Sequence, residues 1–211
     1  MVVGSDHKLK GIEVGQMVQV SQVSTLKSAF ITRATVASQI SLILTGTVFL
    51  AVMAQISIPI PGSPVPLTGQ TLGVLLLGTA YGAGLGFSTI AFYLLMGMAG
   101  APIFSSGTSG IERIVGPTGG YLVGMLISSL VLGTLAGRKW DQKIKTVIPT
   151  MIIGNSIIFA VGLFWLYQYT GQSWSWTFEK GFTPFIFGEI LKIAIASTAL
   201  PAVWKYVSKR S

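Results

Sequence analysis

The sequence predicts an all-α polytopic membrane protein with six transmembrane helices, and three observations support this prediction. Of the 211 residues, 51% are hydrophobic and only 9% are charged, whereas about a quarter of the residues in a soluble domain are charged. Several uncharged apolar runs approach the roughly 20 residues that an α-helix needs to cross a bilayer. These runs are continuous, which favours helices over the alternating strands of a β-barrel.

The formal net charge of +8 is concentrated in three polar segments: the N-terminal region, one internal loop and the C-terminal end. Under the positive-inside rule these segments are cytoplasmic. Six spans would place both termini on that same side, so charge and span count agree. The basic residues of these three segments are Lys8, Lys10, Lys27, Arg33, Arg138, Lys139, Lys143, Lys145, Lys205, Lys209 and Arg210. We attribute them to membrane topology and expect no binding of nucleic acid.

The composition also argues against metal and hydrolase chemistry. The chain has no cysteine, and its single histidine, His7, lies in the polar N-terminal region. Thiolate or histidine metal sites and a Ser-His-Asp triad are therefore not expected. An intramembrane enzyme would have to use Glu189 with Lys192 as its acid–base pair. We expect no enzyme activity and no metal or cofactor in this chain.

The chain divides into a cytoplasmic polar tail over residues 1–33, a membrane domain over 34–207 and a cytoplasmic end over 208–211. The second and third spans are short for roughly 30 Å of hydrocarbon, so tilt or burial within the protein must cover the deficit. The expected spans are 34–58, 71–80, 85–100, 118–137, 146–169 and 184–203.

The first span carries a stripe of small residues. Ala37, Ser41 and Thr45 recur at every fourth position and so share one helix face. Such stripes let helices approach closely in membranes. Two interpretations stay open: packing within this chain, or docking of another membrane subunit.

A proline-rich segment follows the first span. It contains Pro59, Pro61, Pro64 and Pro66 and ends at Thr68, without any charge. Proline is incompatible with a helix interior and keeps the preceding residue extended. The segment is interpreted as a stiff gating lid folded over the protein, with a rigid turn between spans as the alternative.

The fourth span opens on a turn of glycine and proline over residues 116–121, shortly after Glu112 and Arg113. Thr118 is expected to cap the helix by accepting a bond from a free amide. Gly119 allows close approach of the backbone to another group. Because a helix start carries unpaired N–H groups and a partial positive charge, this turn suits a carboxylate.

Two charges lie inside the last apolar run. Glu189 and Lys192 are three residues apart and share a helix face. A charged side chain costs about 2.5–3.5 kcal/mol at the bilayer centre on insertion scales, so the pair is either a structural ion pair or a ligand site.

With Arg113 and the helix start at Thr118, the pair predicts a site for a small, amphipathic anion that has its own N–H groups. Tyr93 and Phe104 are candidate apolar walls. Trp174 and Trp176 are either membrane-interface residues or further walls of this site.

Several motifs in order resemble the BioY family, the biotin-capturing membrane subunits of energy-coupling factor (ECF) transporters. The resemblance covers about residues 34–207. It rests on the segments IP and VPLTGQT at 58–59 and 65–71, YLLMG at 93–97, GAPIF at 100–104, GPTGGY at 116–121, and PF with GEILK at 184–185 and 188–192.

The resemblance implies a six-helix S-component fold in the cytoplasmic membrane that binds biotin near the outer face. It also implies a transmembrane coupling protein and two cytoplasmic ATPases as partners. No phosphate-binding loop of the G-x-x-x-x-G-K-[ST] type occurs here, so partner subunits would use the ATP. The alternatives are a stand-alone oligomeric biotin carrier, or an S component for a related vitamin or biotin precursor.

The resemblance further implies that Lys192 and the acid at 189 contact the ligand, with help from Arg113. The family usually has Asp where Glu189 stands. The family's ligand-contacting Asn has no counterpart here, where the loop after the third span reads Ser105-Ser106.

Overall fold

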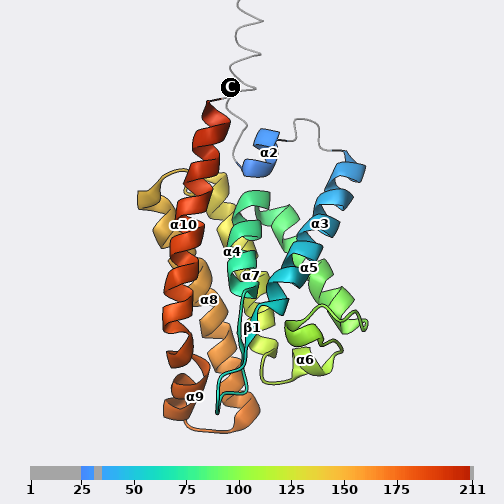
Figure 1. The fold of residues 1–211 in the computed structure, drawn as a ribbon, viewed down its shortest axis with the longest axis vertical. Helices are drawn as coiled ribbons and strands as arrows, with labels where there is room; N and C mark the ends of the chain where they lie inside the picture. The colour runs from blue at the N-terminus through green and yellow to red at the C-terminus, as the bar shows by residue number, and fades with distance from the viewer. Residues whose placement is uncertain (1–24, 31–34, 210–211) are drawn as a thin grey trace, which may run out of the picture.

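The computed structural model describes residues 25–30 and 35–209, which form a bundle of helices (Figure 1). Most of the predicted tail over 1–33, with His7, Lys8, Lys10 and Arg33, lies outside these ranges, as do residues 210–211. The long helices are α3 (Val36–Gln55), α4 (Gln70–Tyr81), α5 (Ala83–Met98), α7 (Gly119–Gly137), α8 (Ile144–Thr170) and α10 (Ile186–Ser208). The short ones are α2 (Leu26–Phe30), η1 (Ser105–Gly107), α6 (Glu112–Val115), α9 (Trp174–Gly181) and η2 (Thr183–Phe185).

The long helices follow the six predicted spans closely. Four stretches of the described chain are long and apolar enough to cross a membrane: α3, α7, α8 and the run Trp174–Ser208 that ends in α10. The other two, α4 with 12 residues and α5 with 16, reach only about 18 Å and 24 Å. The chain is thus a helical multi-pass membrane protein with two helices shorter than the bilayer.

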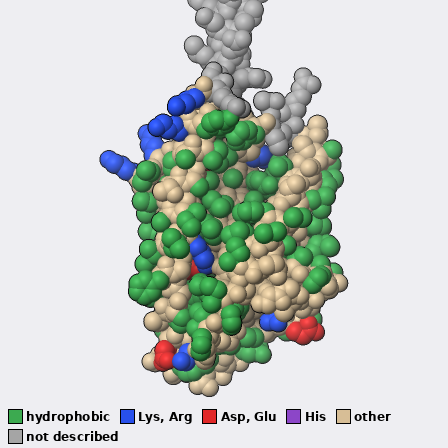
Figure 2. Space-filling view, in the orientation of Figure 1, with side chains coloured by type: hydrophobic (Ala, Val, Ile, Leu, Met, Phe, Trp, Pro, Cys, Tyr) green, Lys and Arg blue, Asp and Glu red, His purple; other side chains and the backbone are tan. Residues whose placement is uncertain are grey.

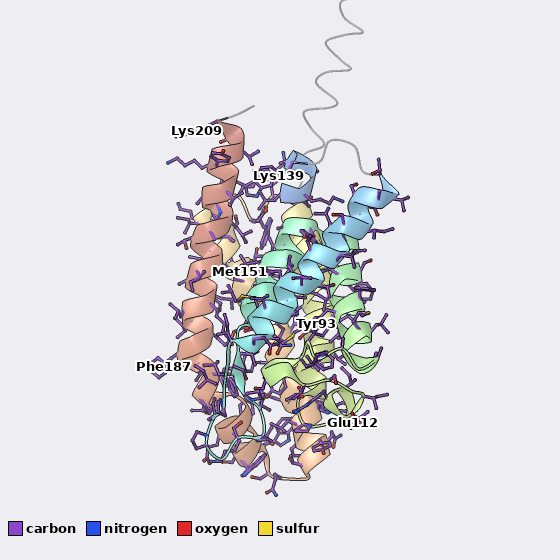
Figure 3. All side chains as sticks on the ribbon, turned by 45° about the vertical axis from the view of Figure 1, so that its right-hand side comes forward. Tyr93, Glu112, Lys139, Met151, Phe187 and Lys209 are labelled. Atoms are coloured by element: carbon purple, nitrogen blue, oxygen red, sulfur yellow. The ribbon has the colours of Figure 1, made fainter. Side chains whose placement is uncertain are left out.

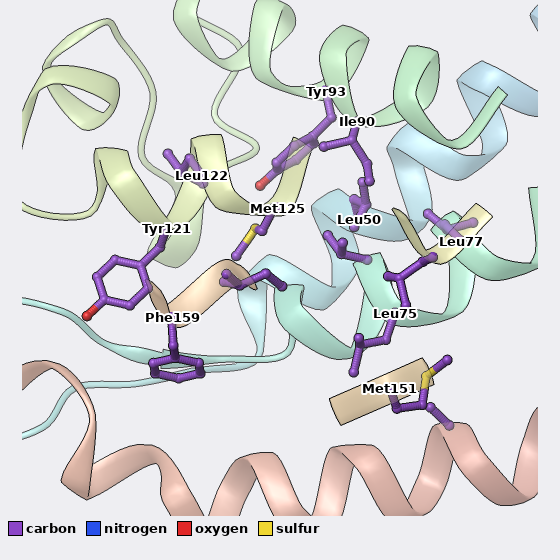
Figure 4. Packing of buried hydrophobic residues seen from close by; sticks show 14 of the residues in the cluster. Leu50, Leu75, Leu77, Ile90, Tyr93, Tyr121, Leu122, Met125, Met151 and Phe159 are labelled. Carbon is purple, nitrogen blue, oxygen red and sulfur yellow. The ribbon is translucent and has the colours of Figure 1, made fainter. Parts of the chain in front are cut away.

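The short helix α4 lies inside the bundle, where α3, α5, α7 and α10 surround it. Most of its residues are buried. A Cβ on Gly78 would lie 3.1 Å from the Cα of Ser129, so this glycine lets α7 approach closely. Leu75 and Leu77 meet Leu50 of α3 and Ile90 of α5 in the core (Figure 4). Burial within the protein therefore covers the length deficit of α4, as predicted.

The proline-rich segment forms a small hairpin that the all-α prediction missed. Strands β1 (Ser57–Ile58) and β2 (Leu67–Thr68) pair antiparallel, with Ser57 opposite Thr68. Near the tip, the Ser63 hydroxyl donates to the carbonyl oxygen of Lys180, at 2.7 Å. The extended backbone was expected, and the tie to α9 adds a tertiary contact that holds the hairpin against the bundle.

Charged side chains gather at the two ends of the molecule, and the face in view between them is largely hydrophobic or uncharged (Figure 2). Lys139 and Lys209 lie at one end, and Glu112 lies near the other (Figure 3). The start of α3 and the end of α10 lie at the same end as Lys139 (Figures 1 and 3). The one-sided distribution of basic residues predicted from the sequence is present in the described part of the chain.

Helix α3 turns its small-residue stripe outward. Ala37, Ser41 and Thr45 are all exposed, so the interpretation that they pack within the chain is wrong for the described residues. The Thr45 hydroxyl bonds back to the carbonyl oxygen of Ser41 at 2.9 Å, which satisfies it without a partner helix. Docking of another subunit on this face stays a prediction.

Candidate functional site

A cavity opens between the hairpin, the loop after α5 and the starts of α7 and α10. It encloses about 620 Å³ of space free of atoms, its open side to the solvent included. Its lining comes from segments far apart in the sequence. The lining residues are Val65, Pro66, Thr68, Gln70, Thr71, Phe104, Ser105, Thr108, Arg113, Thr118, Tyr121, Leu122, Met125, Phe159, Phe185, Glu189 and Lys192.

Lys192 is fixed on one side of the cavity by three acceptors. Its ammonium donates to Glu189 Oε1 at 2.5 Å, to the Thr71 hydroxyl at 2.8 Å and to the Thr68 carbonyl oxygen at 2.6 Å. The Thr71 hydroxyl in turn donates to Glu189 Oε1, at 3.0 Å. An ammonium has three N–H groups, so these contacts use its full donor capacity.

Only one of the two carboxylate oxygens of Glu189 has hydrogen-bond partners among the described residues. The residue is 5% exposed, and its second oxygen, Oε2, is buried without a hydrogen-bond partner in the described part of the chain. A buried acceptor without a donor carries the cost of lost hydration, about 1–3 kcal/mol and more when charged. This oxygen can accept N–H groups from a bound molecule. The two sequence interpretations of the pair thus coexist: Glu189 bonds to Lys192, and both line a cavity.

Arg113 contributes a second charge to the cavity from the short helix α6. Among the described residues it makes no salt bridge. A guanidinium stays charged and binds carboxylates through two parallel hydrogen bonds. It can therefore hold an anionic group, whereas the donors of Lys192 are already engaged.

The expected cap of α7 by Thr118 is wrong. Thr118 precedes the helix, but its side chain accepts no bond from the first-turn amides. Its hydroxyl instead donates to the carbonyl oxygen of Arg113, at 3.1 Å. Thr118 thus holds the backbone of Arg113 in place. The cap prediction failed because a threonine hydroxyl can donate to a nearby carbonyl as readily as its oxygen can cap a helix.

Aromatic rings line the cavity together with the charged groups. Tyr121 meets Phe159 edge-to-face, with ring centroids 5.8 Å apart, and Phe159 meets Phe185 at 5.9 Å; Tyr121, Phe159 and Met125 are labelled in Figure 4. The Tyr121 hydroxyl donates to the carbonyl oxygen of Gly181, at 2.8 Å, and so points toward α9. These walls suit an apolar ring system between polar ends.

Four of the six predicted binding residues line this cavity: Glu189, Lys192, Arg113 and Thr118. Tyr93 and Gly119 do not. Tyr93 is 1% exposed and lies in the protein core. A Cβ on Gly119 would lie 1.7 Å from the carbonyl oxygen of Ile114, so the close approach expected of this glycine is to its own chain.

The remaining predictions divide in the same way. Of the proposed gating residues, Pro66 and Thr68 line the cavity, while Pro59, Pro61 and Pro64 do not. Phe104 is a wall, as expected. Neither tryptophan is among the lining residues. Trp174 is 44% exposed and stacks on Tyr167 at 4.2 Å, which fits the membrane-interface interpretation.

Sequence reasoning missed most of the uncharged lining. Leu122, Met125 and Phe159 come from apolar runs that gave no sign of which side chains face a cavity. Gln70, Thr71, Tyr121 and Phe185 stand inside the segments 65–71, 116–121 and 184–185 that carried part of the family resemblance, which was the available signal. The described residues contain no group of three His, Cys, Asp or Glu that could hold a metal ion.

Comparisons with known proteins show the family of this chain. A family model described as the BioY family matches residues 21–209. The biotin transporter BioY2 of Lactococcus lactis is 40% identical over 161 residues, which cover 75% of this chain and 85% of the relative. The probable biotin transporter BioY of Pyrococcus horikoshii is 36% identical over 160 residues, or 76% of this chain and 92% of that protein.

The fold is also that of a solved protein. The crystal structure of the S-component for biotin from an ECF-type ABC transporter superposes with a TM-score of 0.72. The match covers 82% of this chain and 95% of the other, at 22% sequence identity. The S-component architecture implied by the sequence motifs is therefore the observed fold.

Proposed function

The chain belongs to the BioY family, and from this premise we propose that it captures biotin at the outer face of the cytoplasmic membrane as the substrate-binding subunit of an ECF-type importer. Membership makes it a transport protein and not an enzyme. One observation carries the proposal. One cavity is lined both by Glu189, whose second carboxylate oxygen is buried without a donor, and by Arg113, which makes no ion pair, among the residues that the structure describes.

Biotin has complementary groups. Its ureido ring carries two N–H donors, its fused rings are apolar, and its valerate chain ends in a carboxylate. Glu189 Oε2 can accept a ureido N–H, and Arg113 can bind the carboxylate. Tyr121 and Phe159 can cover the ring system. Lys192 then serves to hold the Glu189 carboxylate in place, since its own donors are already bonded.

The distribution of charge supports the orientation. The end with Lys139 and Lys209 is the cytoplasmic one under the positive-inside rule (Figure 3). The cavity includes Arg113 of α6, which lies toward the opposite end (Figure 1). It would thus open toward the outside. All six long helices would cross the membrane, with α4 and α5 shielded or tilted within the bundle.

Import requires an energy source that this chain lacks. The exposed face of α3 with Ala37, Ser41 and Thr45 is a suitable surface for a transmembrane coupling protein, because small residues let a second helix approach. Two cytoplasmic ATPases would complete the transporter and consume the ATP. A stand-alone oligomeric carrier is the alternative. Biotin uptake in a host without coupling subunits separates the two: uptake supports the carrier, and its absence supports the importer.

The binding site is tested by equilibrium binding of labelled biotin to protein purified in mild detergent. We expect Glu189→Gln to weaken binding about 10- to 100-fold, since hydrogen bonds to charged groups contribute about 1.5–3 kcal/mol. Lys192→Ala should abolish binding, because it leaves Glu189 buried and unpaired. Wild-type affinity in both variants would reject the site.

The chain offers a matched control. Glu179 and Lys180 form a surface ion pair at 2.7 Å, and neither lines the cavity. Glu179→Gln removes one negative charge and Lys180→Ala removes one positive charge, as the two site variants do. Here the charges are removed from α9, the short helix that precedes α10 in the sequence. Both should retain wild-type affinity. A comparable loss of binding in these variants would mean that net charge, and not the site, controls the affinity.

A further inference from the structure

A chain of buried and partly buried hydrogen bonds begins at the cavity lining, at Thr68 and Gln70, passes through Tyr93 and ends beside another wall of the cavity. The Thr68 hydroxyl donates to Gln70 Oε1 at 3.1 Å, and Gln70 Nε2 donates to the Tyr93 hydroxyl at 2.8 Å. The Tyr93 hydroxyl donates to the carbonyl oxygen of Ile103, at 2.9 Å. Gln70 and Tyr93 are 4% and 1% exposed. The proposed binding of biotin gives Tyr93 no direct role, because this side chain does not line the cavity.

The directions of these bonds are mutually consistent. A phenol has one hydroxyl proton. Tyr93 donates this proton to the backbone carbonyl oxygen of Ile103, which can only accept. The Tyr93 oxygen must then accept from its other neighbour, which requires the NH₂ group of Gln70 at that position. The Gln70 oxygen is thereby turned toward the Thr68 hydroxyl. Each group fixes the orientation of the next, as in a cooperative hydrogen-bond network.

Both ends of the chain reach groups that shape the cavity. At one end, the carbonyl oxygen of Thr68 accepts from Lys192, which in turn holds Glu189. At the other end, Ile103 immediately precedes Phe104, a wall of the cavity that is 2% exposed. The Tyr93 ring also packs edge-to-face on Phe104, with centroids 5.5 Å apart.

The loop that carries Phe104 depends on such tethers. Positive φ values occur at Gly100, Ser106, Gly107 and Gly110, and the only regular structure there is the single turn η1. Besides Tyr93, side chains of the first span and β1 hold it: Gln55 Nε2 donates to the Phe104 carbonyl oxygen at 3.2 Å, and the Ser57 and Ser105 hydroxyls bond at 2.7 Å. The backbone of the loop also bonds to itself and to Gly97, and these side-chain bonds tie the Phe104 wall to α3 and β1 in addition.

We propose that Tyr93 is a positioning residue for ligand binding: through Gln70 it keeps the Thr68 anchor of Lys192 and the Phe104 wall in register, without touching the ligand. This role rests on the proposed function. It predicts that removing the Tyr93 hydroxyl weakens biotin binding, although this hydroxyl does not line the cavity. The effect would pass through Gln70, which is 23 residues from Tyr93 in the sequence.

The test is Tyr93→Phe, which keeps the ring against Phe104 and removes only the hydroxyl. We expect the dissociation constant for biotin to rise about 5- to 20-fold. Gln70→Leu breaks the same chain of hydrogen bonds and also changes the cavity lining, so it should weaken binding at least as much. The double variant should bind no worse than Gln70→Leu alone, because both changes break one chain of hydrogen bonds. Amide hydrogen exchange in the ligand-free protein should rise within residues 101–108 in both variants.

Matched controls lie on the same two helices. Thr79 of α4 and Thr89 of α5 are fully buried hydroxyls that bond only to their own helix, at 2.7 and 2.8 Å. Thr79→Val and Thr89→Val each remove a buried hydroxyl without breaking the chain of hydrogen bonds from Thr68 to Ile103. They should leave both the affinity and the exchange of residues 101–108 at wild-type values, whatever they do to the unfolding temperature.

The outcomes distinguish the inference from the proposed function. A wild-type protein that binds no biotin defeats the proposed function, while the exchange measurement still tests the tether. Wild-type binding together with unchanged affinity and exchange in Tyr93→Phe overturns the inference. If Tyr93→Phe cannot be purified folded, Thr68→Val takes its place, because it removes the terminal hydroxyl and keeps the carbonyl that Lys192 needs. An unchanged affinity in that variant overturns the inference equally.

Discussion

Gly97 supports the cavity wall because it has no side chain. A Cβ at this position would lie 2.2 Å from the ring of Phe104, well inside contact distance. The backbone of Gly97 also accepts the amide of Gly110 at 2.8 Å, at the end of the same loop. The glycine in the YLLMG motif is thus explained by the aromatic ring that packs on it.

We therefore predict that Gly97→Ala displaces Phe104, lowers stability by about 1–3 kcal/mol as expected for overpacking, and weakens biotin binding. Thermal unfolding in detergent and equilibrium binding measure the two effects. Gly84 is the matched control on the same helix, because a Cβ there meets nothing within 4 Å. Gly84→Ala should bind normally and be neutral or slightly more stable, since Ala favours helix over Gly. Equal effects of the two changes would contradict the packing argument.

At the same scale, the charged residues of the cavity were predictable, whereas most of the apolar ones, Phe104 excepted, were not. Glu189 and Lys192 stand out because an ionised side chain in an apolar run is costly and needs a reason. Phe159 and Met125 give no such signal, since a hydrophobic side chain on a membrane helix looks the same whether it faces lipid, core or cavity. Whether the lining residues contact biotin stays a prediction.

Among the elements, the six long helices were predictable to within about five residues because hydropathy and glycine or proline breaks mark their ends. The hairpin of β1 and β2 was not, because strands of two residues show no periodicity. The short α4 was recognisable as a span, but its place inside the bundle became clear only from its neighbours. Sequence patterns thus define helices better than the contacts between them.

A buried contact joins two elements at the basic end of the molecule. Asp141, in the turn between α7 and α8, is 0% exposed, and its Oδ2 accepts from Trp204 Nε1 of α10 at 2.6 Å. Its Oδ1 is buried without a partner among the described residues. Burial raises the pKa of Asp141 to about 6, against an ordinary value of 3.8, although the Trp204 bond opposes the shift.

This raised pKa means that folding favours the protonated carboxyl. Its stabilising contribution is complete below about pH 4 and is lost as the pH rises through 6, amounting to at most roughly 3 kcal/mol. Asp141→Asn keeps an acceptor for Trp204 and cannot ionise, so it should unfold at a higher temperature than wild type at pH 7.5 and at a similar one near pH 4. The surface variant Glu179→Gln should track wild type. Parallel curves for wild type and Asp141→Asn would show that the carboxyl does not titrate in this range.

For the whole molecule, the number of apolar runs and the placement of basic residues were enough to predict that the start of α3 and the end of α10 lie at the same end. Both patterns follow from the cost of moving charge through lipid. The identity of the outward faces was not predictable. The small-residue stripe on α3 fits internal packing as well as docking by sequence, and only its exposure in the folded chain separates them.

That exposure leads to a prediction about the assembled transporter. Ser41→Leu adds bulk on the stripe, and Ser41 is not among the cavity-lining residues, so biotin binding by the purified subunit should match wild type. Uptake with the coupling protein and ATPases present should fall at least tenfold, because close helix approach needs small residues. Val48→Leu is the control, since Val48 is exposed on the same helix and already branched; its uptake should be near wild type. Full uptake by Ser41→Leu would mean that a different surface receives the coupling protein, and loss of binding would mean that α3 supports the cavity itself.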